Sequence, residues 1–366
     1  MNTLVPLSDY FDVWINTFLF LVLFTLLHTW VLKINDTKNI AFINIAGYIL
    51  LVFVIFYIGQ RPISGRYFGD MRTYVTYFYD YQMGAEIKGT KDIFFHVFMK
   101  ASSYAFSVHG FFTLCAMIYI LPLVRISKVF FKEYWYYSFF MFLVSYSFYT
   151  YGVNGIRNGA AASLFLLGVS FKDKKILMGL CFLAALSFHK TMFLPITAFL
   201  ITYVYNSPKF YLKGWLLCIP LSLALGSVWI ALFANLGFGD DDRLAGYLTT
   251  QAEEGTFSQT GFRWDFLFHS AFAVFAGWYF IFKKKFVDSF YNQLLNTYLI
   301  CNGFWILVIN ANFSNRFAYL SWFMMAIVIV YPMLKERLFK NHHIMLGKIV
   351  FVYFLFTYSM YYLYAG

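Results

Sequence analysis

Long apolar runs, separated by short polar clusters, recur along nearly the whole chain, and this feature constrains the fold more than any other. A helix needs about 20 apolar residues to cross a bilayer, and only helices and closed barrels satisfy their backbone polar groups there. The composition agrees, because 61% of the 366 residues are hydrophobic and only 12% are charged. Soluble domains have about 25% charged residues. The sequence therefore predicts an all-α, polytopic membrane protein.

We expect about twelve transmembrane helices that form a single integral membrane domain over residues 1–366. Hydropathy sets their approximate bounds. The expected spans are 13–32, 40–59, 109–124, 134–151, 156–171, 176–188, 191–205, 214–234, 264–282, 289–309, 317–334 and 344–364. The two longest connections are outer loops at about 60–108 and 235–263.

The basic residues predict how these spans are oriented. If the N-terminus lies outside, every cytoplasmic loop carries at least two Lys or Arg residues, as the positive-inside rule requires. Seventeen of the 28 basic residues then lie inside. Because this topology accounts for the net charge of +11, no nucleic-acid partner is expected.

The division between lysine and arginine carries a second signal. Fifteen of the inner basic residues are lysine, whereas seven of the eleven outer ones are arginine: Arg61, Arg66, Arg72, Arg157, Arg243, Arg263 and Arg316. Topology alone does not ask for arginine outside. A planar guanidinium suits bidentate contacts with phosphate or carboxylate. The outer arginines therefore predict an anionic ligand or, alternatively, salt bridges to outer acids such as Asp70 and Asp265.

Several spans are short for a bilayer. Between the lysine clusters at 172–175 and 209–213 the chain must cross twice. Helices of about 13 and 15 residues rise only about 20 Å, against a hydrocarbon core of about 30 Å. The tip between them, His189 and Lys190, is therefore expected below the outer membrane surface. Polar residues at that depth indicate an outward-facing, water-filled cavity.

Arg157 is the strongest candidate for a ligand-binding residue in that cavity. It lies in "NGIRNG" near the outer start of a span, with Asn154 and Asn158 on neighbouring faces at helical spacing. Free N–H groups at a helix N-terminus favour anions and would add to the charge of the arginine. The alternative is structural, because the glycines form a GxxxG pattern that lets helices pack closely while Arg157 snorkels. The two interpretations are compatible.

Two other outer positions are candidates for chemistry. Arg316, in "SNRF", opens a later span in an arrangement that resembles that of Arg157, which predicts two arginines converging on one group. His189 suits a general base, and His189 or Lys190 suits a phosphate ligand. The structural alternative for His189, a hydrogen-bonding residue of the membrane core, is about equally favoured.

The first long loop is rich in tyrosine. Its stretch "GRYFGDMRTYVTYFYDY" mixes aromatic rings with acids and arginines, which suits sugar rings, and Tyr74 is the candidate for that contact. Tyrosine is also a common interfacial anchor. Asp70 lies between Arg66 and Arg72 in this stretch and is either a general base or a salt-bridge partner.

The run "GDDDR", which ends at Arg243, invites a metal interpretation, because adjacent acids can bind Mg²⁺ beside a diphosphate. Adjacent residues rarely all face one ion, so we expect no metal and keep Arg243 as a substrate-binding candidate. The sequence has no Walker motif, HExxH, GxSxG or paired Cys/His set, and no cofactor is predicted.

Four blocks together resemble the EpsG-like branch of the Wzy-type polysaccharide polymerases. They are "GRYFGDMRTY", "NGIRNGAAASLFLLGVS", "LSFHKTMFLP" and "SNRFAYLSWFMM", in that order, between residues of about 60 and 335. Each block alone is degenerate, but four in order are fairly specific. The first 60 residues add only hydropathy.

The resemblance implies a reaction, a fold and a place. Such enzymes move a growing glycan from undecaprenyl diphosphate onto a hydroxyl of the next lipid-linked repeat unit, at the outer leaflet of the bacterial cytoplasmic membrane. It implies a GT-C-like fold and a reaction without a metal. The partners implied are a lipid-diphosphate-linked oligosaccharide and membrane lipids, and an interaction with a chain-length regulator is a further possibility. The resemblance implies that Arg157 and Arg316 bind the diphosphate and that His189 and Lys190 line the site. It places Arg66 and Asp70 with them through the first of the four blocks. The general base is expected to be His189 or Asp70.

Two other functions are kept as alternatives. One is an O-antigen-ligase-like or other GT-C-type glycosyltransferase that uses a lipid-linked sugar. The other is a transporter of such a lipid, which should show inverted repeats and polar residues near the midplane. The sequence shows no clear repeat, and its polar groups cluster at the outer ends of the spans.

Overall fold

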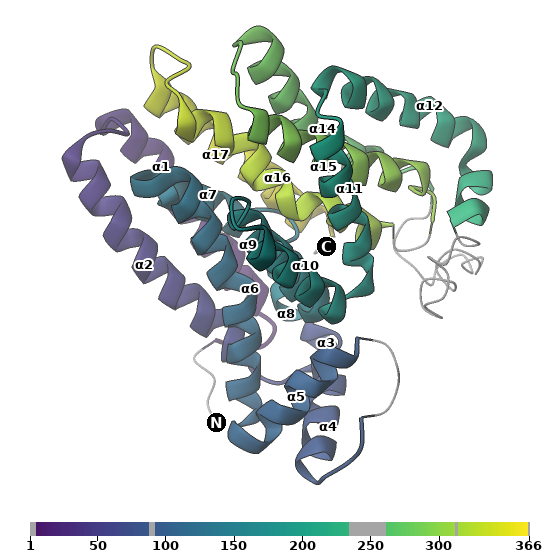
Figure 1. The fold of residues 1–366 in the computed structure, drawn as a ribbon. Coiled ribbons are helices and arrows are strands. Elements are labelled where there is room, and N and C mark those ends of the chain that lie inside the picture. Colours follow the sequence, from purple (N-terminus) through teal and green to yellow (C-terminus); the bar gives the residue numbers. More distant parts are fainter. Residues whose placement is uncertain (1–4, 88–91, 234–260, 312–313, 365–366) are drawn as a thin grey trace. The chain divides into compact units, whose positions relative to one another are not determined.

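The computed structural model describes residues 5–87, 92–233, 261–311 and 314–364. The regular secondary structure of these residues is helical, which confirms the all-α fold class. The chain divides into two compact units, drawn in Figure 1. Unit 1 comprises Met1–Phe193 with Met333–Gly366, and unit 2 comprises Leu194–Pro332.

Unit 1 holds the N-terminal helices and the last helix of the chain (Figure 1). Its elements are α1 (Tyr10–Val31), α2 (Thr37–Gly59), α3 (Gly65–Phe68), α4 (Met71–Gln82), α5 (Ile93–Ala105), α6 (Val108–Phe131), η1 (Lys132–Tyr134), α7 (Trp135–Leu143), α8 (Phe148–Val153), α9 (Ile156–Ser170), α10 (Lys175–Phe188), η2 (Lys190–Met192) and α17 (His342–Tyr364).

Helix α9 packs against both α6 and α10 within unit 1. The hydroxyl of Ser163 donates a hydrogen bond of 2.6 Å to the carbonyl of Tyr119 on α6. On the other side, a Cβ at Gly168 would lie 2.7 Å from the Phe182 ring of α10, so only glycine fits there without a shift. Small residues therefore bring α9 close to its neighbours, as the sequence pattern predicts.

The first outer loop, 60–108, is largely helical. It contains α3, α4 and α5, and Figure 1 shows these helices at the end of unit 1 opposite the α1–α2 turn. Ser64 begins α3 by accepting a hydrogen bond of 3.2 Å from the N–H of Tyr67. Helices α4 and α5 pack against each other. They are amphipathic and bury residues such as Phe78 and Phe95.

Unit 2 consists of α11 (Phe193–Val204), α12 (Pro208–Phe233), α14 (Trp264–Trp278), the π-helical turn η4 (Tyr279–Lys283), α15 (Ser289–Leu307) and most of α16 (Asn315–Lys335). A buried amide on α15 connects four of these helices. Asn302 donates to the hydroxyls of Ser270 at 3.0 Å and Ser321 at 2.9 Å, and it accepts from the indole N–H of Trp215 at 2.7 Å. Its amide is thus satisfied without water, as a buried polar group requires.

Seven helical segments of the described residues are long and apolar enough to cross a membrane, which confirms a polytopic membrane protein. They are Tyr10–Val31, Thr37–Gly59, Val108–Leu143, Pro208–Phe233, Trp264–Lys283, Asn315–Lys335 and His342–Leu363. Each of the twelve spans expected from hydropathy overlaps helical structure among the described residues. Several of these helices are short, however, with 14 residues in α10 and 12 in α11. The count of about twelve crossings therefore stays a prediction.

Several of the expected spans have different bounds in the structure, and two of these differences have an evident cause or form. The span 109–124 continues as α6 to Phe131, because its basic side chains find lateral partners. Arg125 donates to the Ser170 hydroxyl at 3.1 Å, and Lys128 donates to the Tyr48 hydroxyl at 2.6 Å. The span 134–151 is interrupted, since α7 ends at Leu143 and α8 begins only at Phe148.

Candidate substrate-binding site

Arg157 lies in the first turn of α9 and reaches across to the helices of the first outer loop. Its Nη1 donates a hydrogen bond of 2.7 Å to the carboxylate of Asp92, and its Nε donates one of 3.1 Å to the hydroxyl of Tyr74. The side chains of Arg157 and Asp92 are 21% and 11% exposed, so this ion pair is partly desolvated. The third nitrogen, Nη2, donates no hydrogen bond to any residue that the structure describes. The Nε and Nη1 atoms of the guanidinium are therefore held by the protein, while Nη2 stays available to a ligand.

Asp92 is placed for this contact by an unusual backbone conformation. It precedes α5 with φ at 51°, a left-handed conformation that Asp tolerates better than most residues. An Asp at this position usually caps its own helix, for a gain of about 1 kcal/mol. The Asp92 carboxylate makes no such capping bond. It instead accepts from Arg157, 65 residues further along the chain.

A histidine and a tyrosine lie beside this ion pair. The Tyr81 hydroxyl and Nδ1 of His96 are 2.9 Å apart. Burial lowers the pKa of His96, and the positive charge of Arg157 lowers it further, while the negative charge of Asp92 opposes the shift. His96 is therefore neutral at pH 7 and can accept a proton.

Asn154 holds the turn that carries Asp70. Its side-chain oxygen accepts a hydrogen bond of 3.1 Å from the backbone N–H of Asp70. Gly69, just before, has φ of +54°, and a Cβ there would collide with the Asn154 side chain. The Asp70 carboxylate makes no capping bond to α4. It forms no direct ion pair with another residue in the described part of the chain, although its negative charge acts on the Arg157 guanidinium. Whether Asp70 is a base or a charge partner stays a prediction.

His189 lies in the extended break between α10 and η2. Its Nδ1 accepts from the backbone N–H of Thr191 at 3.4 Å and lies 2.7 Å from the Thr191 hydroxyl. A neutral imidazole whose Nδ1 accepts carries its proton on Nε2. This arrangement favours a hydrogen-bond donor over a proton acceptor at His189. The neighbouring Lys190 is exposed.

The remaining candidates are dispersed. Asn158 is buried on α9, and its Oδ1 has no hydrogen-bond partner among the described residues. The Arg66 guanidinium is exposed and lies 5.6 Å from the ring centroid of Tyr67. Arg316 is exposed in the first turn of α16, within unit 2, so its convergence with Arg157 stays a prediction. Arg243 and the run "GDDDR" lie outside the described residues.

The outer arginines do not form one functional set. Arg61 is almost fully buried and donates to the carbonyls of Ile58 and Val153, at 2.5 and 2.8 Å. Arg263 makes a bidentate salt bridge to Asp265, at 2.9 and 2.6 Å. Arg263 thus makes a salt bridge of the kind that the structural alternative predicts, whereas Arg61 is held by backbone carbonyls and forms no ion pair with a described residue.

The residues that sequence reasoning missed are Asp92, Tyr81 and His96. A signal for two of them was present, because Asp92, His96 and Lys100 recur at intervals of four in the apolar segment "DIFFHVFMK". That spacing places polar groups on one face of a helix. Its partner across the fold, Arg157, could not be found from local spacing.

The described residues contain no group of three or more His, Cys, Asp or Glu side chains that could hold a metal ion. The groups around Arg157 are the Tyr74 hydroxyl, the paired carboxylate of Asp92 and, at longer range, the carboxylate of Asp70. Nη2 of the guanidinium is the group here that suits an anion.

The structure shows a polytopic, all-α membrane protein with an arginine, Arg157, held by hydrogen bonds at the end of unit 1 that carries α3–α5. The model of the EpsG family matches residues 51–366, and the chain belongs to that family. Membership suggests a role in polysaccharide biosynthesis. No curated protein and no solved structure matches the chain. The GT-C-like fold thus stays a prediction.

Proposed function

We propose that the chain is a polysaccharide polymerase of the bacterial cytoplasmic membrane. It transfers a growing glycan from undecaprenyl diphosphate onto the next lipid-linked repeat unit at the outer leaflet. Family membership supports the pathway. The observation that carries the proposal is the Arg157 guanidinium, anchored through Nε and Nη1 with Nη2 left without a hydrogen bond to the described residues.

Arg157 acts as a preorganised donor to the departing diphosphate. Asp92 and Tyr74 fix the plane of the guanidinium before substrate arrives, so little ordering remains to be done in the transition state. A hydrogen bond to a charged group contributes about 1.5–3 kcal/mol. A hydrogen bond that strengthens by this amount in the transition state increases the reaction rate by about 10- to 150-fold.

The chemical step is a displacement at the anomeric carbon of the growing glycan. The acceptor hydroxyl forms a new C–O bond, the bond from that carbon to the diphosphate breaks, and the electron pair leaves with undecaprenyl diphosphate. The hydroxyl proton passes to a base. We assign that role to His96, because it lies one helical turn after Asp92, the partner of Arg157, and its Nδ1 is 2.9 Å from the Tyr81 hydroxyl. Asp70 and His189 are the alternative bases.

The remaining sequence candidates stay proposed substrate-binding residues: Arg66, Tyr74, Asn154, Asn158, Lys190 and Arg243, with Arg316 as a second diphosphate ligand. The Asn158 oxygen, buried without a partner among the described residues, supports a direct role for that amide. No metal or cofactor is proposed, because arginine donors supply the charge that the leaving group needs.

Incubation of the purified chain with its lipid-diphosphate repeat unit tests the proposal. A polymerase converts that unit into a ladder of longer lipid-linked products on a gel. A ligase would instead transfer preformed glycan to another acceptor without lengthening it. A transporter would leave every product at its original length, and either of these outcomes contradicts the proposal.

A further inference from the structure

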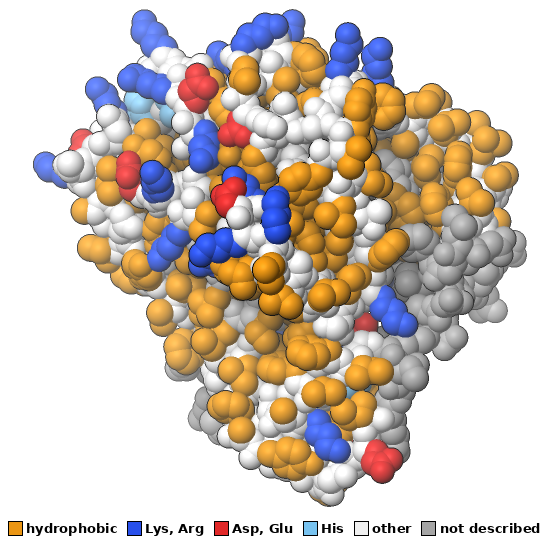
Figure 2. Space-filling view, in the orientation of Figure 1, with side chains coloured by type: hydrophobic (Ala, Val, Ile, Leu, Met, Phe, Trp, Pro, Cys, Tyr) orange, Lys and Arg blue, Asp and Glu red, His pale blue; other side chains and the backbone are white. Residues whose placement is uncertain are grey.

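A cavity with a partly polar lining lies at the end of unit 1 opposite helices α3–α5. It has a volume of about 270 Å³ and is bounded by the α1–α2 turn, the end of α16 and the start of α17. Figure 2 shows basic and histidine side chains gathered at the upper left, where α1 gives way to α2. Residues that line it include Lys33, Asn35, Tyr134, Arg337, His342 and His343.

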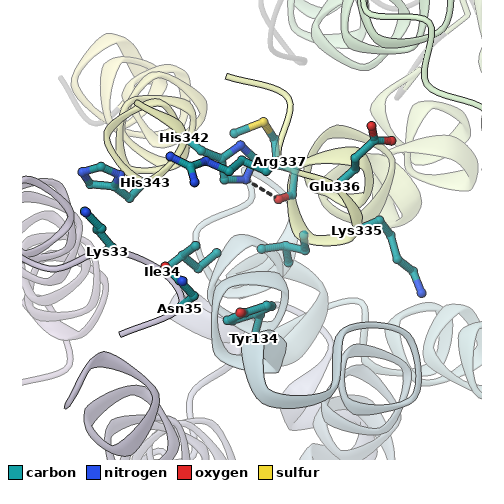
Figure 3. Close-up of a pocket in the computed structure, with 11 residues that line it drawn as sticks. Lys33, Ile34, Asn35, Tyr134, Lys335, Glu336, Arg337, His342 and His343 are labelled. Carbon is teal, nitrogen blue, oxygen red and sulfur yellow. Dashed lines mark hydrogen bonds between the residues drawn. The ribbon is translucent and has the colours of Figure 1, made fainter. Parts of the chain in front are cut away.

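Three nitrogen-bearing side chains from separate segments approach one side of this cavity (Figure 3). They are Lys33 after α1, Arg337 after α16 and His343 in α17. None of the three forms an ion pair with a carboxylate that the structure describes. Among the described residues, Arg337 makes a single long hydrogen bond, 3.4 Å to the carbonyl of Lys340. Glu336 also lines the cavity, but Figure 3 shows its carboxylate directed away from these groups.

The walls of the cavity are held in place by the fold. Nε2 of His342 lies 2.6 Å from the carbonyl of Met333, and its Nδ1 accepts from the N–H of Leu338 at 3.3 Å. His342 thereby ties the end of α16 to the start of α17. One turn further, Gly347 lets α17 pack directly against Thr29 of α1, with no room for a Cβ. This contact keeps His343, four residues earlier on the same face, beside the end of α1.

Basic residues on this membrane face are expected from topology alone, and most of them extend into solvent. The cavity differs because Lys33 and Arg337 come from separate segments, line one open hollow together with His343 and lack acidic partners among the described residues. Both basic side chains are exposed. Neutral polar groups, Asn35 and Tyr134, share the lining. The first turn of α17 adds the positive end of a 23-residue helix.

We infer that this cavity binds a phosphate group, supplied by the headgroup of an anionic phospholipid or by free phosphate. Arg337 suits bidentate contact with phosphate oxygens, and Lys33 suits a point contact with the same group. His343 and the start of α17 complete the donor set. The site is separate from the proposed catalytic one, because it lies at the other end of unit 1 (Figure 1).

Two binding measurements on the purified full chain in detergent test this site and identify the source of the phosphate. Native mass spectrometry compares retention of palmitoyl-oleoyl-phosphatidylglycerol with that of the zwitterionic phosphatidylcholine. Equilibrium dialysis measures binding of radiolabelled inorganic phosphate. We expect Lys33→Gln with Arg337→Gln to lower the affinity for one probe by about tenfold or more, since each basic residue near a lipid surface contributes about 1 kcal/mol.

The matched control is Lys209→Gln with Lys213→Gln. Lys209 and Lys213 are exposed lysines of unit 2 that do not line the cavity. The charge distribution predicts that they lie on the same membrane face as the cavity, and the double substitution removes the same charge as the cavity variant. The control should retain affinity within about twofold. A third variant, Asn35→Glu, places a carboxylate in the cavity at an exposed position and should also weaken binding, even if the double variant fails to fold.

Each outcome is decisive. Loss of phosphatidylglycerol alone assigns the site to a lipid headgroup, and loss of inorganic phosphate alone assigns it to a free anion. The inference is overturned if neither probe binds better than phosphatidylcholine, or if the cavity variants and the lysine control weaken binding equally.

Discussion

The variant Arg157→Lys keeps the positive charge of Arg157 but lacks the planar guanidinium, so it tests the contribution of the guanidinium alone. A lysine at this position keeps one positive charge near Asp92, so the ion pair in the first turn of α9 survives. It loses the Nε contact with Tyr74 and the second terminal nitrogen. The variant therefore removes the donor proposed for the diphosphate while leaving the local charge unchanged.

The expected loss of rate follows from these contacts. The missing donor is worth about 1.5–3 kcal/mol if it acts fully in the transition state. A misplaced ammonium adds to that, and loss of one preorganised donor in other enzymes costs about 2.7–4 kcal/mol. We therefore expect the rate of glycan extension to fall by about 30- to 1,000-fold. The free energy of unfolding should change by only about 1 kcal/mol, because the ion pair is retained.

The assay is the initial rate of ladder formation by purified protein, read by gel from lipid-diphosphate repeat units. Arg72→Lys is the matched control, since Arg72 is an exposed arginine on α4 in the same outer segment. That variant should extend glycan at the wild-type rate. An Arg157→Lys protein that is folded and within threefold of wild type would refute the role assigned to Nη2.

Four further results are expected. Asp92→Asn should destabilise the protein by about 1–3 kcal/mol, because it leaves the partly buried Arg157 without its carboxylate partner. The melting temperature in detergent should fall, and an unchanged melting temperature would contradict this prediction. Because the pKa of His96 lies below its ordinary 6.5, the acidic limb of kcat/KM should lie below that pH. Asp92→Asn removes a charge that raises this pKa, so the limb should move to lower pH, and a move to higher pH counts against His96 as the base. Gly69→Ala should cost about 1–3 kcal/mol and reduce activity, since φ is +54° and the added methyl meets Asn154. Activity should persist in excess EDTA. Loss of activity that Mg²⁺ restores would support a metal role for the acidic run at 240–242.

Hydropathy predicted the positions of the helices because lipid solvation acts on every residue of a span in the same way. It failed at α6, where Arg125 and Lys128 mark an apparent end. Their partners Ser170 and Tyr48 belong to other helices, so no local pattern shows that the helix continues to Phe131.

The candidate site was predicted in part. Arg157 stood out because a charge in apolar sequence is costly, and the Gly and Asn residues around it signalled a helix start and close packing. Its partner Asp92 was not predicted, because an acidic residue just before a helix is normally interpreted as the N-cap of that helix. Only the folded chain shows that this carboxylate forgoes capping for an ion pair across 65 residues.

The account depends most on diphosphate being the leaving group that Arg157 stabilises. Its most direct test is the stoichiometry of the reaction, measured as undecaprenyl diphosphate released for each glycosidic bond formed by the purified protein. We predict one lipid diphosphate per bond, with release and extension slowed equally in Arg157→Lys. Extension without that release, or release of the monophosphate, would contradict the proposed chemistry.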